Sequence, residues 1–341
     1  MTDLIQSIKN TISQSIQFDE AHRAFVLFDT QSELARTITD AYREAIPSAQ
    51  FVNFESVSTD EALALLMSHG ENDFIVLIQS GSFRLNEFRL RVELFKLKIK
   101  VIEYGHLDRI PSSEIPTYLS ALEYDADYYR TVGHSLKKKI DVAQTIRVET
   151  PAGVLEYQGG FEDAKLNIGD YTGMKNVGGQ FPIGEVFTEP KDLSCVNGEV
   201  SLFAFGDREF RMRVQDAPFS VTIHMGEIVD VQGAPDEFHA VLDLIREEEE
   251  RIGLRELGFG LNRALTRTKT LVDIGAYERM SGVHMSLGAK HTIYNKPGFS
   301  RKHSRFHVDV FVAVDRVLIE NECVFQNGRY FNYPQSNSSY P

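Results

Sequence analysis

The spacing of hydrophobic residues changes near residue 143, and this change limits the folds that the chain can adopt. Before it, short apolar runs such as AFVLFD (24–29) and FIVLIQS (74–80) alternate with segments of helical spacing. After it, polar and apolar residues alternate around a Pro-Ala-Gly turn in QTIRVETPAGVLEYQGG (144–160), which is typical of a β-hairpin. We therefore predict an α/β plus α+β fold: a parallel-sheet α/β domain over residues 1–140, then a mostly antiparallel, β-rich domain over residues 141–341.

The predicted first domain is Rossmann-like but carries no nucleotide-binding signature. Its turns contain neither GxGxxG nor GxxxxGK[ST], and the turn QSGSF (79–83) has a single glycine. We interpret this domain as a scaffold or an oligomerisation domain. Leu4, Ile8, Ile12 and Ile16 are four residues apart, which predicts one apolar stripe of an amphipathic helix rather than a signal peptide.

The composition excludes several kinds of partner. The formal charge is −13, from 49 acidic and 36 basic residues, whereas nucleic acids and anionic membranes are bound by clustered Lys and Arg. No apolar run reaches the length of a membrane span. The two cysteines, Cys195 and Cys323, form no CxxC pair and suit a reducing compartment. We expect a cytoplasmic protein that binds neither nucleic acid nor membrane.

Three residues of the second half have the chemistry of a metal site. In RFHVDV (305–310), His307 and Asp309 are two residues apart, so on a strand they share one face while the valines point to the other. Upstream, SGVHMSLGAKH (281–291) places His284 after a small-residue turn and before Gly288. Two histidines and one carboxylate are enough for a facial triad that holds non-haem iron, or for one catalytic zinc.

Two glutamates stand in unusual settings nearby. Glu185 lies between Gly184 and Val186 in a glycine- and proline-rich segment, and Glu256 precedes Leu257 and two glycines. A carboxylate among apolar neighbours is costly unless it is paired or bound to a metal. Taken singly, each of the candidates is more often a solvated or hydrogen-bonded residue. Together they favour two divalent ions that share ligands and activate water, held by Glu185, Glu256, His284, His307 and Asp309.

Four motifs occur in an order that resembles a known enzyme family. GQFPIGEVFTEP, ELGFGLN, GVHMSLG and HVDV together resemble the thermophilic metalloaminopeptidases, the family of aminopeptidases T and S, over roughly residues 135–310. The resemblance implies removal of amino-terminal residues from peptides, in dimers or larger homo-oligomers. It also implies a second domain with two divalent ions (Zn, Co or Mn), whose ligands are the five residues named above.

The sequence departs from that family at two positions. His291 stands where the family usually has a tyrosine, and Ile183 where it has an acid. The predicted mechanism uses a metal-activated water, with Glu256 or Glu185 as general base. His291 would then donate a hydrogen bond to the tetrahedral oxyanion. An equally simple interpretation makes His291 a loop residue in contact with Tyr294.

Two other functions remain open. The 2,5-dihydroxypyridine dioxygenases belong to the same superfamily, and similarity to them implies ring cleavage by a single Fe(II) on His284, His307 and Asp309. The substrate is then a small aromatic molecule rather than a peptide. The second alternative is a non-catalytic relative that acts as a binding protein. The identity of the bound metal separates the aminopeptidase from the dioxygenase, and absence of bound metal identifies the binding protein.

Overall fold

The structure is a computed structural model, and it describes residues 2–83, 85, 90–209, 211–291, 293–294, 296, 305–331 and 333. The chain forms two compact units. Unit 1 consists of Met1–Ala126 and Gly169–Ile183, and unit 2 of Asp127–Ile168 and Gly184–Pro341. This division differs from the expected boundary after residue 140, because residues 127–140 belong to unit 2 and residues 169–183 belong to unit 1. In unit 2, a Cβ atom added to Gly133 would lie 2.8 Å from the side chain of Ile168.

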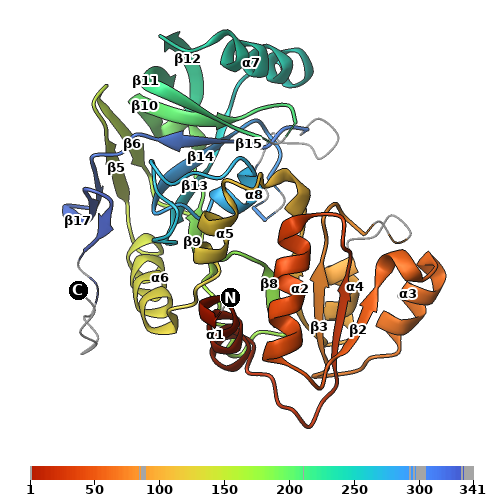
Figure 1. Cartoon of the computed structure of the whole chain (residues 1–341). Coiled ribbons are helices and arrows are strands. Elements are labelled where there is room, and N and C mark those ends of the chain that lie inside the picture. The colour runs from red at the N-terminus through yellow and green to blue at the C-terminus, as the bar shows by residue number, and fades with distance from the viewer. Residues whose placement is uncertain are drawn as a thin grey trace. The chain divides into compact units, whose positions relative to one another are not determined.

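Unit 1 contains the predicted parallel sheet (Figure 1). Its strands lie in the order β2-β1-β3-β4-β8, and all neighbouring pairs are parallel. The strands are β1 (Ala24–Phe28), β2 (Gln50–Asn53), β3 (Phe74–Ile78), β4 (Lys100–Tyr104) and β8 (Gly178–Gln180). The helices are α1 (Thr2–Asn10), continued by a π-helix (Thr11–Ile16), α2 (Glu33–Ala45), α3 (Thr59–Met67), α4 (Leu90–Lys96) and α5 (Ile115–Ala121), with 3₁₀ turns at Phe54–Ser56 and Leu107–Arg109.

Alternating residues of the central strands explain how the helices cover this sheet. Phe25 of β1 and Ile75 of β3 pack with Leu66 of α3 and Leu94 of α4 in one apolar cluster. Helix α2 covers the opposite face (Figure 1). The amino-terminal stripe is confirmed, since Leu4, Ile8, Ile12 and Ile16 are all buried. Ser58 begins α3 with a capping box, in which its hydroxyl accepts from the Glu61 N–H while Glu61 accepts from the Ser58 N–H.

Unit 2 is built on one large antiparallel sheet. In the described part of the chain it has 13 strands, whose main order is β18-β17-β16-β5-β6-β10-β15-β14-β13-β9-β7, with β11 and β12 branching from β10. The strands are β5 (Thr145–Glu149), β6 (Val154–Gln158), β7 (Lys165–Asn167), β9 (Glu185–Thr188), β10 (Val196–Gly206), β11 (Met212–His224), β12 (Glu227–Gln232), β13 (Leu254–Gly260), β14 (Gly282–Leu287), β15 (Val308–Val312), β16 (Arg316–Ile319), β17 (Glu322–Gln326) and β18 (Arg329–Tyr330). The helices are α6 (Ala126–Ile140), α7 (Asp236–Glu249) and α8 (Ile274–Tyr277), with a 3₁₀ turn at Leu193–Cys195. The α/β plus β-rich fold class is thus confirmed.

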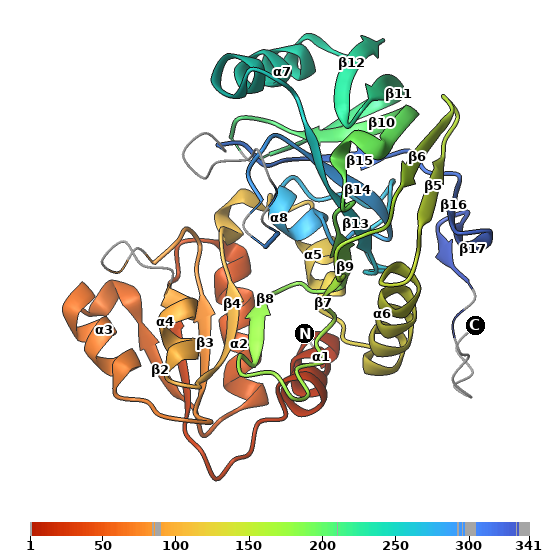
Figure 2. The ribbon, with the colours of Figure 1, turned by 180° about the vertical axis from the view of Figure 1, so that it is seen from behind.

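Local sequence signals account for two landmarks of unit 2. The Pro-Ala-Gly turn joins β5 to β6, where Glu149 pairs with Val154 as in the predicted hairpin. Helix α7 begins after Pro235 and carries Asp236 and Glu237 in its first turn, where acids favour the helix dipole. Its residue Phe238 packs between aromatic rings of β10 and β11. Figure 2 shows this helix on the sheet from behind.

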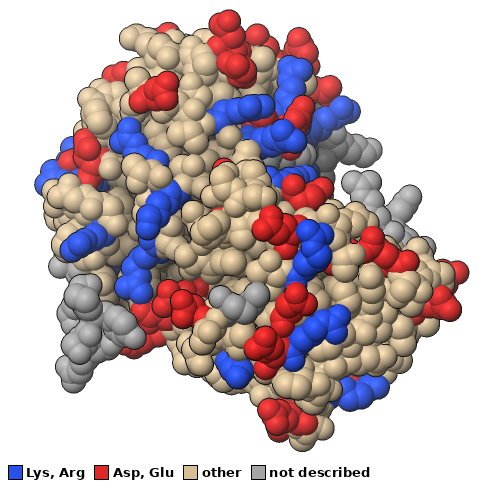
Figure 3. Space-filling view, viewed as in Figure 1, with Lys and Arg blue, Asp and Glu red and all other residues tan. Residues whose placement is uncertain are grey.

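The predicted absence of nucleic-acid and membrane partners stays a prediction. On the face seen in Figure 3, Lys and Arg are interspersed with Asp and Glu. Within the described ranges, no helix is both long and apolar enough to cross a bilayer. The predicted location and oligomeric state stay predictions.

Candidate metal centre

The five predicted ligands come together on one face of the unit 2 sheet. Strands β9, β13, β14 and β15 are neighbours in that order, and each supplies one residue. Across the ladders, Glu185 lies opposite Gly260, His284 opposite Gly258, and Asp309 opposite Ser286. Directly opposed residues point to the same side of a sheet, so these side chains share a face. The donors are Glu185 (β9), Glu256 (β13), His284 (β14), Asp309 (β15) and His307, which immediately precedes β15.

These donors form two groups with one common member. Glu185, Glu256 and His284 offer ligand atoms that lie within 4.8 Å of one another, and so do Glu256, His307 and Asp309. Glu256 therefore belongs to both groups. Nitrogen and carboxylate oxygen donors suit divalent ions such as zinc, cobalt, manganese or iron.

Strand β13 gives these side chains the space they need. A Cβ atom at Gly258 would lie 2.1 Å from His284 Nε2, so only glycine lets the imidazole occupy its place. The ladder with β14 shifts register between Leu254 and Leu257, which marks a bulge at Arg255 and Glu256. Bulges of this kind re-aim side chains next to active sites. Here the bulged backbone N–H of Glu256 donates to the Ser286 hydroxyl, 3.1 Å away.

The first donor group is buried and charged. His284 is fully buried, and its Nε2 lies 3.1 Å from Glu185 Oε1 and 3.4 Å from Glu256 Oε1. Burial by itself lowers the pKa of His284, but the two carboxylates outweigh it and raise that pKa well above its usual value. Arg279 Nη1 donates to Glu185 Oε2 at 2.8 Å and also contacts Glu278. Burial raises the pKa of Glu278 to about 8 despite Arg279, with Glu185 and Asp309 adding to the rise.

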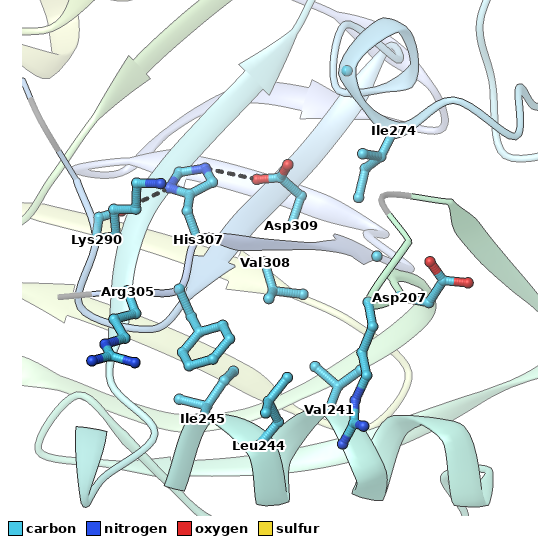
Figure 4. A pocket seen from close by; sticks show the side chains of 14 residues that line it. Asp207, Val241, Leu244, Ile245, Ile274, Lys290, Arg305, His307, Val308 and Asp309 are labelled. Carbon is cyan, nitrogen blue, oxygen red and sulfur yellow. Dashed lines mark hydrogen bonds and ion pairs between the residues drawn. The ribbon is translucent and has the colours of Figure 1, made fainter. Parts of the chain in front are cut away.

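The second donor group is oriented by the backbone. His307 Nδ1 donates to the Lys290 carbonyl at 3.1 Å, which directs Nε2 toward Asp309 Oδ1, also 3.1 Å away (Figure 4). A carbonyl that fixes the far nitrogen of an imidazole is the usual support of a metal-binding histidine. Burial opposes protonation of His307, yet the Asp309 carboxylate raises its pKa to about 10.

Unsatisfied atoms test whether a cation fits here. Both ring nitrogens of His284 and the Oδ1 atom of Asp309 are buried and make no well-aligned hydrogen bond with any described residue. Their short contacts to charged neighbours are within ion-pair distance but poorly directed. Buried polar atoms are normally hydrogen-bonded, so orphans that converge with carboxylates fit ligation by a metal ion.

A chain of ionic contacts that sequence reasoning missed supports Glu256. Arg255 Nε and Nη2 donate to the two oxygens of Glu189 at 3.0 and 3.2 Å. Glu189 Oε1 in turn accepts from His291 Nδ1, and His291 Nε2 lies 2.9 Å from Glu256 Oε2. Opposing the effect of burial, His284 and His291 hold the pKa of Glu256 below its usual range. In the sequence, Arg255 is a charged residue inside an otherwise apolar strand, and Glu189 is a charged residue beside Pro190.

His291, expected to face either the oxyanion or Tyr294, also contacts two carboxylates. Both of its ring nitrogens face carboxylates, so neither N–H is left to stabilise an oxyanion in this arrangement. Burial lowers the pKa of His291, but Glu189 and Glu256 raise it above the usual value. The contact with Tyr294 is present as well, with ring centroids 5.3 Å apart.

A two-unit chain with this donor arrangement has the fold of known enzymes. A 2,5-dihydroxypyridine dioxygenase from Pseudomonas putida KT2440 superimposes with a TM-score of 0.63 at 15% identity, over 96% of both chains. AmpT, aminopeptidase T from Thermus thermophilus, superimposes with a TM-score of 0.57 at 14% identity, over 96% of this chain and 99% of AmpT. No protein-family model matches the sequence, and no curated sequence is similar to it. The likeness is therefore one of fold.

Proposed function

We propose that this chain is a metal-dependent hydrolase of the aminopeptidase type, which removes the first residue of a peptide. The observation that carries the proposal is the membership of Glu256 in both donor groups. A carboxylate common to two ligand sets is the arrangement that holds two divalent ions close together. A facial triad for one iron would instead draw on His284, His307 and Asp309 as one set, and these three do not form a group among the described residues.

The residues divide the work as follows. Glu185 and His284 would hold one ion, His307 and Asp309 the other, and Glu256 both. Bound divalent ions would polarise the substrate carbonyl and lower the pKa of a water molecule. Glu256 is committed to both ions, so we assign the general-base role to Glu185, which belongs to one group alone. His291 Nε2, 2.9 Å from Glu256 Oε2, would hold the shared carboxylate in position. Glu189 keeps the imidazole in place.

One observation favours a second candidate function. Arg279 already compensates the charge of Glu185 through a 2.8 Å contact. If that pair persists when metal is bound, Glu185 is not a ligand and one ion remains. Such a chain would be an Fe(II) ring-cleaving dioxygenase of the 2,5-dihydroxypyridine type, and one structural neighbour is a 2,5-dihydroxypyridine dioxygenase. A non-catalytic relative would bind no metal at all.

Metal content separates these functions. Protein purified anaerobically without chelator is analysed by plasma mass spectrometry beside Asp309→Ala. We expect near two equivalents of zinc, cobalt or manganese, with at least one lost in the variant, and hydrolysis of an aminoacyl peptide panel. One equivalent of iron with oxygen uptake on 2,5-dihydroxypyridine would replace the hydrolase by the dioxygenase. Absence of metal after loading would eliminate both enzymes.

A further inference from the structure

A cavity of about 340 Å³ lies within unit 2 beside the second donor group. It is enclosed by α7, the turn after β10, the start of α8 and the segment that leads into β15 (Figure 4). His307 and Asp309 form one wall, so whatever fills the cavity touches the candidate metal centre. The volume is at the small end of ligand pockets, which suits one side chain rather than a long peptide.

The walls of this cavity are apolar. Val241, Leu244 and Ile245 are spaced i, i+3, i+4, so they form one stripe of α7 that faces the cavity. Phe306, Val308 and Ile274 of α8 complete the apolar lining (Figure 4). Such a surface favours an apolar group, because removing apolar surface from water is favourable.

The rim of the cavity is basic. Arg208, Lys290 and Arg305 line it and are exposed. Arg305 Nη1 lies 2.7 Å from Glu248, and the acid on the rim, Asp207, is paired with Arg213 at 2.7 Å. Arg213 therefore neutralises the rim acid and Glu248 neutralises Arg305, so Arg208 and Lys290 give the rim its positive charge. A cationic substrate group would be repelled as it enters.

We infer that this cavity receives the side chain of the first residue of the substrate, and that it selects peptides beginning with a Leu- or Phe-sized apolar residue and rejects those beginning with Lys or Arg. This inference rests on the proposed hydrolase function. Leu244 is the specificity-determining residue, because it lies on the apolar wall and remains partly exposed, so a larger side chain there can fill the space.

Two variants of Leu244 and one control test the selection. The zinc-loaded full-length protein is assayed on the p-nitroanilides of Phe, Ala and Lys. In the wild type we expect kcat/KM for Phe to exceed that for Ala and for Lys by about 100-fold. Leu244→Trp should reduce the Phe value by about 20-fold or more, with little change for Ala. The control His239→Trp adds the same bulk on the exposed side of α7 and should leave all ratios unchanged.

The second variant gives a gain that a misfolded protein could not produce. Leu244→Glu places a carboxylate in the cavity and should raise the Lys-to-Phe ratio of kcat/KM by about 10-fold or more. Unchanged ratios in both Leu244 variants would overturn the inference while leaving the hydrolase in place.

A binding experiment tests the preference of the cavity for an apolar side chain even if no substrate is hydrolysed. Isothermal calorimetry with free L-phenylalanine, L-alanine and L-lysine should give the tightest binding for phenylalanine, by about 10-fold or more. Leu244→Trp should remove that preference. Preference without hydrolysis would keep the cavity assignment and refute the proposed reaction, and equal affinities would refute the cavity assignment.

Discussion

Glu189 and Arg255 form a buried ion pair next to the candidate metal centre. Their side chains are 0% and 1% exposed, and two hydrogen bonds join them. Taking two charges out of water costs several kcal/mol per ion, which their mutual attraction offsets only when the geometry is good. The pair holds His291, and through it Glu256, so we interpret it as support for the site rather than as a source of stability.

A single variant and a double variant test this interpretation. Glu189→Leu leaves the Arg255 guanidinium buried without its carboxylate, and we expect the free energy of unfolding to fall by about 3–5 kcal/mol. Adding Arg255→Met should recover most of that loss, because an apolar pair needs no charge compensation. Urea unfolding measures both. The exposed pair Lys98–Glu71 is the control, and Lys98→Ala should change stability by less than about 1 kcal/mol. A double variant as unstable as Glu189→Leu would contradict the interpretation.

Strands and helices were predictable where their signal is local. The alternation in residues 144–160 gave β5 and β6, the apolar run from Phe74 gave β3, and the His-x-Asp pattern brought His307 beside Asp309. The hydrophobic periodicity of a strand does not predict which distant strand pairs with it. The return of β8 to β4 depends on Gly178, whose Cβ would lie 1.9 Å from the Val101 carbonyl oxygen. The bulge in β13 could not be seen in the alternation either, since it shows only when β14 is alongside.

For the candidate site too, local features were predictable from the sequence and long-range contacts were not. The motifs predicted the five donors, but they did not predict that the donors form two groups around Glu256. That grouping depends on the spatial order β9-β13-β14-β15, which is set by long-range pairing. For His291 the sequence left open an oxyanion donor or a contact with Tyr294, and its partner Glu189, 102 residues away in the chain, was not predicted. Contacts at such separation leave no local pattern.

Strand β13 offers a test of how the sheet positions a ligand. Gly258→Ala would place a methyl group against the His284 ring, and we expect the imidazole to move out of the first donor group. Affinity for zinc at that group should fall by about 10-fold to 100-fold, measured by competition with a chromophoric chelator. Gly253→Ala is the matched control, because a Cβ atom there would have no neighbour within 4 Å. Equal zinc affinity in the two variants would show that His284 is not a ligand.

The candidate metal centre and the parallel sheet belong to different units of the molecule. All five donors belong to unit 2, and the apolar cluster around Phe25 and Ile75 belongs to unit 1. A ligand that binds only the folded form stabilises the part of the protein that forms the binding site. Metal should therefore stabilise unit 2 directly, while unit 1 keeps the stability of its own core.

Amide hydrogen exchange can resolve the two units in the intact protein. At zinc concentrations about 100 times the dissociation constant, binding adds about 2.7 kcal/mol to the folded state, equivalent to roughly 100-fold slower exchange through unfolding. We expect that slowing in β13, β14 and β15 and little change in β1 and β3. Chelator should reverse it, and Asp309→Ala should weaken it. Equal slowing in both sheets would mean instead that the units unfold together, so that metal bound by unit 2 stabilises the parallel sheet as well.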